Sequence, residues 1–249
     1  MSEEFSGPRT AIVTGGAKRI GAALVRALAA DGWHVLIHYN RSREEAEQLA
    51  REIGNAGTVQ AELAEPDSAD RIMAGLEGLP PPRLLVNNAS LFRNDSLADF
   101  SVAQWDVHQA VNLRAPALLT QRFAAELGEA NGLIVNLLDA KLAAPNPDFF
   151  SYTVTKMGLA GLTELSARAL APRVRVCGIA PSVTMVSGPQ SRDNFDKVHR
   201  LNALGRGVEA DQIVAALRFI IASPTLTGQT ITLDGGLRFL SLPRDVQYL

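Results

Sequence analysis

A tyrosine and a lysine stand four positions apart at Tyr152 and Lys156, and an aspartate, Asp139, precedes the tyrosine by thirteen positions. Residues i and i+4 of a helix lie on one face, so the ammonium group of Lys156 can approach the phenol of Tyr152 and lower its pKa. A phenol held in this way can donate a proton to a substrate. Many ordinary surface pairs share this spacing, so the pair indicates catalysis only if the surrounding elements form a site.

Length and composition restrict the class of protein. The chain has 249 residues, a formal net charge of −2 and one cysteine, Cys177. This length is enough for one α/β domain, and the charge indicates no surface for nucleic acid or an anionic membrane. We find no signal-peptide pattern and no apolar run near the roughly 20 residues of a membrane span. We therefore expect a cytoplasmic protein whose partner is a small molecule.

Apolar runs typical of β-strands alternate with helical patterns along the chain. This alternation predicts an α/β fold, with one domain over 1–249 and a Rossmann-type doubly wound parallel sheet of about seven strands with helices on both faces. Ligands bind such sheets at the carboxyl ends of the strands. The irregular stretch 181–207 is a predicted substrate lid. The predicted strands are 11–14, 35–39, 58–60, 84–87, 133–138, 174–180 and 230–233.

A glycine-rich turn follows the first predicted strand. Glycines at a strand-to-helix junction let backbone amides approach a pyrophosphate, and the helix N-terminus favours its negative charge. We interpret the turn as a dinucleotide-binding site rather than a plain connection. The residues of the turn that we expect at the cofactor are Gly15, Lys18, Arg19, Ile20 and Gly21.

The end of the second predicted strand indicates the type of dinucleotide. A site for NAD usually has a carboxylate there for the ribose hydroxyls, and the segment Tyr39, Asn40, Arg41 and Ser42 contains none. Arg41 and Ser42 instead offer hydrogen-bond donors to a 2′-phosphate, so NADP(H) is the predicted cofactor. The alternative is that Arg41 is a solvated residue at the start of the next helix.

Motifs along essentially the whole chain resemble those of the short-chain dehydrogenase/reductase family. Within that family the chain is most similar to the pteridine reductases, including the bacterial dihydromonapterin and dihydrofolate reductases. The sub-family features are Arg19 in place of a glycine, the segment 38–42, Ser90, Phe92, and Asp139 where most relatives have serine. The family motifs are the turn 15–21, Asn87-Asn88-Ala89, Asn112, Tyr152 with Lys156, Pro181 and Asp234-Gly235-Gly236.

The resemblance implies roles for these residues. Lys156 is expected to bind the nicotinamide ribose and lower the pKa of Tyr152, while Asn112 interrupts its helix and holds a water of a proton relay. Phe92 is expected to stack on a flat substrate, with Phe149 or Phe150 as a wall. Residues expected at the substrate are Arg19, Ser90, Phe92, Asp139 and Tyr152. Beyond the turn, residues expected at the cofactor are Tyr39, Asn40, Arg41, Ser42, Glu62, Leu63, Asn88, Ala89, Ser90, Tyr152, Lys156, Pro181, Ser182, Val183 and Thr184.

Asp139 changes the expected chemistry. An ionised aspartate only accepts hydrogen bonds, and its charge raises the pKa of a neighbouring tyrosine, so the phenol stays protonated. That environment favours proton delivery to the electron-poor C=N bond of a dihydropterin, from Tyr152, Asp139 or a water that they share. The alternative is that Asp139 only caps a turn after the fifth strand.

We predict an NADPH-dependent reductase that transfers hydride to a C=N bond of a dihydropterin or related pteridine. A reductase of another ketone, quinone or imine and a non-catalytic NADP(H)-binding protein remain open alternatives. No metal site is predicted, because the four histidines lack ligand spacing. The resemblance also implies a homo-oligomer, a tetramer or a dimer. The leucines that could form its contact, or ordinary core, are Leu159, Leu162, Leu165 and Leu170.

Overall fold

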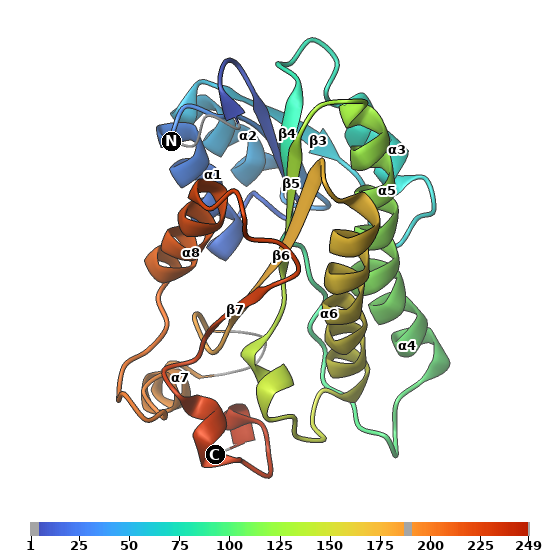
Figure 1. Cartoon of the computed structure of the whole chain (residues 1–249). Helices are drawn as coiled ribbons and strands as arrows, with labels where there is room; N and C mark the ends of the chain where they lie inside the picture. The colour runs from blue at the N-terminus through green and yellow to red at the C-terminus, as the bar shows by residue number, and fades with distance from the viewer. Residues whose placement is uncertain (1–4, 187–190, 249) are drawn as a thin grey trace.

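The computed structural model describes residues 5–186 and 191–248 and places one sheet between two layers of helices (Figure 1). In this part of the chain seven strands form one sheet, parallel throughout, in the order β3-β2-β1-β4-β5-β6-β7. The predicted α/β doubly wound fold is confirmed. The strands are β1 (Thr10–Val13), β2 (His34–Tyr39), β3 (Ala56–Gln60), β4 (Pro82–Asn87), β5 (Gly132–Leu137), β6 (Val174–Pro181) and β7 (Thr230–Leu233).

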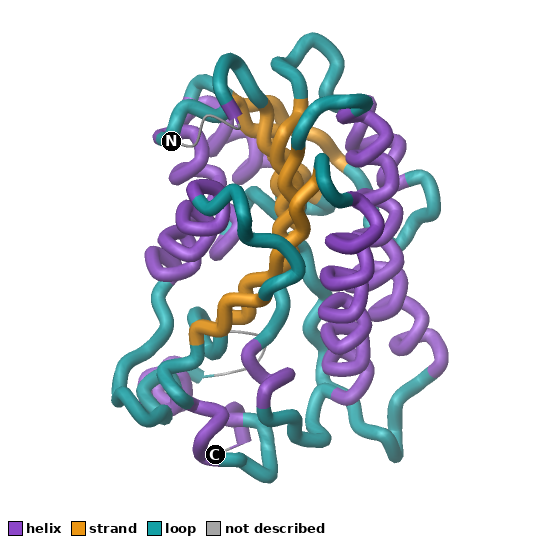
Figure 2. Tube along the Cα trace, viewed as in Figure 1, coloured by secondary structure: helices purple, strands orange, loops and turns teal. Residues whose placement is uncertain are grey.

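Helices cover both faces of the sheet (Figure 2). Residues of α1, α2 and α8 belong to one apolar core, and residues of α3, α5 and α6 to the other. Among the described residues no helix is long and apolar enough to cross a bilayer. The helices are α1 (Arg19–Ala30), α2 (Arg43–Ile53), α3 (Ser68–Ala74), α4 (Val102–Gln109), α5 (Ala115–Leu127), α6 (Phe150–Leu170), α7 (Arg192–Val198) and α8 (Ala210–Ala222).

Successive side chains of the central strands enter opposite cores. In β1, Ala11 and Val13 belong to the core beneath α1 and α8, whereas Ile12 belongs to the core beneath α3 and α5. All three are fully buried. Both faces of a parallel sheet are covered, so its strands need apolar residues at every position. This is why continuous apolar runs predicted the strands.

Strand ends and the predicted lid differ from expectation in detail. β3 begins at Ala56, two residues before the predicted start, and Thr14 lies just beyond β1. The stretch 181–207 contains α7, where the Ser191 hydroxyl accepts a hydrogen bond from the Asn194 amide at 3.2 Å. Residues 187–190 of this stretch lie outside the described residues. Part of the predicted irregular segment is therefore helical, and its role as a lid stays a prediction.

The leucine stripe of α6 is mostly core. Leu159 is buried, and Leu162 and Leu170 pack against buried clusters. Leu165 is 66% exposed. The core interpretation therefore holds for three of these four leucines, and only Leu165 offers substantial apolar surface.

The start of α6 is held by a residue from a distant loop. Phe149 precedes the helix in a left-handed conformation with φ 54°. The amide of Ser151 donates to Oδ1 of buried Asp95 at 2.9 Å, and the Phe150 amide donates to the Asp95 carbonyl at 3.2 Å. Asp95 lies in the loop after β4 and satisfies two amides that have no partner within the helix. It therefore positions the helix that carries Tyr152 and Lys156.

We expect Asp95→Ala to lower the free energy of unfolding by about 0.5 to 2 kcal/mol, the usual loss when a helix cap is removed. Urea denaturation followed by circular dichroism measures this change. Asp99→Ala is the matched control, because the Asp99 carboxylate is exposed and accepts from Ser96 within its own loop. Equal losses in the two variants would contradict the role of Asp95.

Candidate active site

A cavity of about 500 Å³ lies beyond the carboxyl ends of β1, β4, β5 and β6. Segments that follow these strands line it, together with α6 and the C-terminal residues. This is the edge at which doubly wound sheets bind ligands. The predicted site residues that line the cavity are Gly15, Lys18, Arg19, Ile20, Gly21, Asn88, Ala89, Ser90, Phe92, Asp139, Tyr152, Lys156, Pro181, Ser182, Val183 and Thr184.

Other predicted cofactor residues lie outside the cavity lining. Tyr39 and Leu63 are buried in the two cores. The Asn40 amide donates to the Glu62 carboxylate at 2.5 Å. Arg41 follows β2 at the same sheet edge and is exposed. These residues and Ser42 remain predictions for the adenine end of a dinucleotide.

The glycine turn has little room for side chains. Gly15 has φ +61°, a conformation that favours glycine. A Cβ atom at Gly21 would overlap the Gly15 carbonyl oxygen and lie 2.8 Å from Nδ2 of Asn88. Arg19 also has a positive φ of 55°, which is rare for a residue with a side chain. Its guanidinium lies 3.5 Å from the Met185 carbonyl, across the cavity mouth.

Two polar residues outside the predicted set fix this turn. Nδ1 of buried His38 accepts from the Gly15 amide at 3.1 Å, and Nε2 faces the Ala61 carbonyl at 3.0 Å. This pattern needs a neutral ring, and burial lowers the pKa of His38 accordingly. The Thr14 hydroxyl accepts from the amides of Asn88 and Ala89. These contacts join the ends of β1, β2 and β4.

Half-buried Asp139 forms one cluster with the buried residues Tyr152 and Lys156. The Tyr152 hydroxyl donates to Oδ2 of Asp139 at 2.7 Å, and the Lys141 amide donates to Oδ1 at 2.8 Å. Nζ of Lys156 donates to the Leu137 carbonyl at 2.7 Å and lies 5.6 Å from the centroid of the Tyr152 ring. Asp139 therefore both caps a turn and binds the phenol.

Burial governs the protonation of this cluster. The pKa of Tyr152 lies well above its ordinary value, first because the phenol is buried and then because Asp139 is close. Burial also raises the pKa of Asp139, against the effect of its hydrogen bond from Tyr152. Burial lowers the pKa of Lys156 to about 8, although Asp139 acts in the opposite direction. The family resemblance implied that Lys156 lowers the pKa of Tyr152, but here the pKa of Tyr152 is raised. This agrees with the second expectation, that a phenol beside Asp139 stays protonated.

Asn112 lies behind the cavity instead of lining it. It sits in a π-helical turn, Ala110–Arg114, so the predicted interruption of helical hydrogen bonding is present. Its side chain accepts from the Leu91 amide at 2.7 Å and donates to the Leu91 carbonyl at 2.9 Å and to the Thr155 hydroxyl at 3.2 Å. In this structure Asn112 therefore positions the segment after β4 against α6.

Of the three phenylalanines expected near the substrate, Phe92 lines the cavity, whereas Phe149 and Phe150 do not. Phe92 lines the cavity, and its ring stacks on Phe149 with centroids 4.2 Å apart and meets the Tyr152 ring edge-on at 4.7 Å. Phe149 is buried behind Phe92. Phe150 packs against Phe100 and Trp105, so it is not the expected wall.

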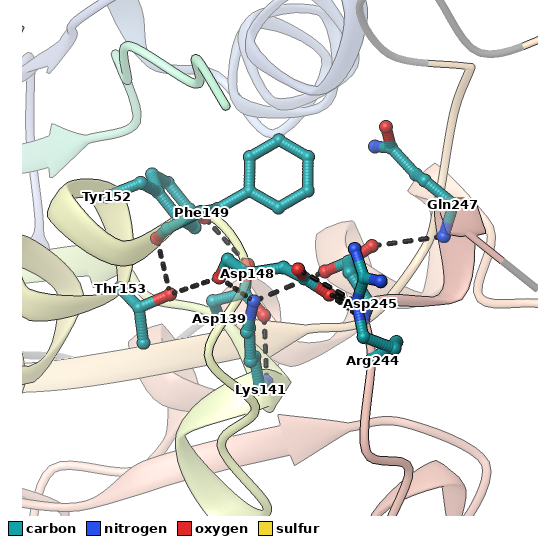
Figure 3. A network of polar contacts seen from close by, with 9 residues as sticks. All are labelled: Asp139, Lys141, Asp148, Phe149, Tyr152, Thr153, Arg244, Asp245 and Gln247. Carbon is teal, nitrogen blue, oxygen red and sulfur yellow. Dashed lines mark hydrogen bonds and ion pairs between the residues drawn. The ribbon is translucent and has the colours of Figure 1, made fainter. Parts of the chain in front are cut away.

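The C-terminal segment is a part of the site that sequence reasoning missed. Leu242, Asp245, Val246 and Gln247 line the cavity. Figure 3 shows Asp245 close to Lys141 and Asp148, two residues from the segment after β5. Isolated polar residues carry no periodic pattern, and only the fold brings them together. Among the described residues there is no cluster of acidic, histidine or cysteine side chains suited to a metal ion.

Comparisons with known proteins agree with this geometry. The model of the family described as "short chain dehydrogenase" matches residues 9–196. The structure described as FolM alternative dihydrofolate reductase 1 from Brucella suis in complex with NADP is 40% identical, with a TM-score of 0.89 over 93% of this chain and 95% of that chain. The corresponding Brucella canis structure is 38% identical, with a TM-score of 0.87 over 94% and 95%. The 3-oxoacyl-[acyl-carrier-protein] reductase of Synechocystis sp. is 30% identical over 92% of this chain and 96% of its own length.

We expect Asp139→Asn to lower the pKa of Lys156 below its value of about 8, because the carboxylate of Asp139 favours the ammonium form. A pH titration of lysine side-chain NMR signals, assigned with Lys156→Met, measures the change. Asp31→Asn is the control, since Asp31 pairs with Arg218 at the far end of α1. An unchanged or higher pKa of Lys156 in Asp139→Asn would contradict this coupling.

Proposed function

The chain belongs to the short chain dehydrogenase family, and from this premise we propose that it is an NADPH-dependent reductase of a C=N bond in a dihydropterin or related pteridine. At the coarser level it is an NADP-dependent short-chain oxidoreductase. The observation that carries the finer proposal is the 2.7 Å hydrogen bond from Tyr152 to Asp139 at the cavity.

The residues of the turn fit a dinucleotide. Gly21 lets the turn close on itself, because a Cβ there would overlap the Gly15 carbonyl oxygen. Gly15, Lys18 and Gly21 line the cavity, where they would meet the pyrophosphate. Lys156 and the segment Pro181 to Thr184 line the same cavity, where they would hold the nicotinamide end. When bound, NADPH supplies the hydride. The chain itself must supply the proton that reduction of a C=N bond also requires.

The cluster is suited to giving a proton. Because its pKa is raised, Tyr152 is protonated at physiological pH. A tyrosinate beside an ionised Asp139 would place two negative charges one hydrogen bond apart, so Tyr152 loses its proton only if Asp139 or Lys156 compensates. Burial raises the pKa of Asp139, so Asp139 can carry a proton of its own and pass it to Tyr152 as Tyr152 gives its proton to the substrate. The two groups therefore behave as one coupled donor. Alcohol oxidation, which needs a basic tyrosinate, is disfavoured.

A flat substrate would lie beside Phe92. Its ring is held by Phe149 and Tyr152, so a rigid aromatic surface is already formed on the cavity wall. Arg19 and Ser90 offer hydrogen-bond donors from the side of the turn. The likeness to dihydrofolate reductases of Brucella supports a pteridine substrate. Reduction of a ketone is the second candidate, and the likeness to a 3-oxoacyl reductase favours it.

We further propose a cytoplasmic homo-oligomer, either a tetramer or a dimer. Met157 and Leu165 of α6 are 45% and 66% exposed, and apolar surface on one helix supports a contact between subunits. The free thiol of Cys177 is buried and suits a reducing compartment.

We expect NADPH to bind far more tightly than NADH, because Arg41 and Ser42 meet the 2′-phosphate. Arg41→Asp should weaken NADPH binding about tenfold or more, the scale of a lost charge-assisted hydrogen bond. Fluorescence titration of both cofactors measures this. Arg43→Asp, two residues later on exposed surface of α2, is the control and should leave the NADPH preference intact. Equal affinities of the wild type for both cofactors would refute the assignment.

We expect Asp139→Ser to lower kcat on a dihydropterin by about 10² or more, the scale for loss of an acid–base group, while activity on a simple diketone holds or rises. NADPH oxidation with dihydrobiopterin, dihydromonapterin, dihydrofolate and the diketone in parallel tests both the proposal and its alternative. Tyr152→Phe should impair every substrate. If Asp139→Ser reduced dihydropterin at the wild-type rate from pH 5 to 8, the carboxylate would be only a turn cap.

A further inference from the structure

The C-terminal residues 242–248 are anchored over the cavity by ionic contacts. Nε of Arg244 donates to both carboxylate oxygens of Asp148, at 2.8 and 3.0 Å, and the Asp245 amide donates to Asp148 at 2.7 Å. The Tyr248 ring stacks on Phe149, with centroids 6.1 Å apart. Asp148 does not line the cavity, whereas Asp245 does. The anchor and the cavity-facing carboxylate are thus two different residues.

Asp245 retains unused capacity to accept hydrogen bonds. Its Oδ1 accepts from the Gln247 amide at 3.1 Å, and its Oδ2 accepts from Nζ of Lys141 at 3.3 Å. A carboxylate has about four acceptor positions, so about two remain for a ligand. The side chain of Lys141 is only 9% exposed, and its ammonium group lies 3.3 Å from the Asp245 carboxylate beside the cavity. A carboxylate attracts N–H and O–H donors and repels carbonyl oxygens.

A second acceptor lines the same cavity. Oδ1 of Asn146 is buried and has no hydrogen-bond partner among the described residues. Asn146 lies two positions before Asp148, which binds the Asp245 amide. A buried acceptor without a partner is costly unless a ligand or water satisfies it. The cavity is therefore lined by two acceptors, Asn146 from the segment after β5 and Asp245 from the C-terminal segment.

We infer that Asp245, with Asn146, is the specificity site that binds hydrogen-bond donors of the substrate away from the reacting bond. This inference rests on the proposed function. On a dihydropterin the donors are of two kinds, the amino and ring N–H groups of the pyrimidine and the hydroxyls of the side chain at position 6. The N–H groups and the hydroxyls are both neutral donors that the Asp245 carboxylate could accept from, and the titrations below distinguish between the two.

Calorimetric titration of the complex with NADP⁺, which cannot donate hydride, tests this with two ligand pairs. One pair is pterin and its 2,4-dioxo analogue, and the other is 6-hydroxymethylpterin and 6-methylpterin. The wild type should prefer the amino-bearing member of the first pair or the hydroxyl-bearing member of the second by about tenfold or more, the scale for a hydrogen bond to a charged group. Asp245→Asn should abolish that preference. Asn146→Ala should reduce it while leaving the Lys141 ion pair intact, and it serves as the second variant if Asp245→Asn does not fold.

Asp31→Asn is the matched control. It removes a carboxylate that pairs with Arg218 away from this cavity, so it should leave the preference within each pair unchanged. Equal wild-type affinities within both pairs, or a preference that survives in Asp245→Asn and Asn146→Ala, would overturn the inference. Turnover of dihydropterin by the wild type is measured separately. A wild type that reduces dihydropterin but shows no pair preference refutes this inference alone, and one that shows the preference but reduces only the diketone refutes the proposed function alone.

Discussion

The 2.7 Å hydrogen bond from Tyr152 to Asp139 is the contact on which the rest of the site depends. It places two ionisable groups in the protein interior close to a third, Lys156, and such groups are costly to bury unless each has a fixed partner. The fold supplies those partners from separate segments. The Leu137 carbonyl accepts a hydrogen bond from Lys156, and the Lys141 amide donates one to Asp139. The cluster is therefore only as well ordered as the ends of β5 and α6.

Two residues distant in the chain hold α6 in place. Asp95 satisfies the first amides of the helix, and Asn112 ties Thr155 to the backbone at Leu91. Neither lines the cavity. Both fix where α6, the helix that carries Tyr152, lies against the segment after β4.

Features that repeat along the chain could be predicted from the sequence, and isolated contacts could not. Covered parallel strands need unbroken apolar runs, so β1 and β4 were visible as sequence patterns. Gly21 was recognisable because its role depends on the absence of a side chain. The caps at Asp95 and the bond from Gly15 to His38 involve single polar residues brought together by the sheet order. The same holds for Asp245, whose partner Lys141 lies 104 positions earlier. Asp139 was identified through the family resemblance, whereas its hydrogen bond from Tyr152 became apparent only in three dimensions.

At Arg19, backbone conformation and side-chain placement act against each other. Its left-handed backbone costs about 1 to 2 kcal/mol for a residue with a side chain, and glycine would remove that strain. Selection for a more stable fold would therefore favour glycine at this position. A chain that retains arginine gives up part of its stability margin to keep a guanidinium at the cavity mouth. Thermostability screens of this protein would thus favour loss of a side chain that lines the cavity.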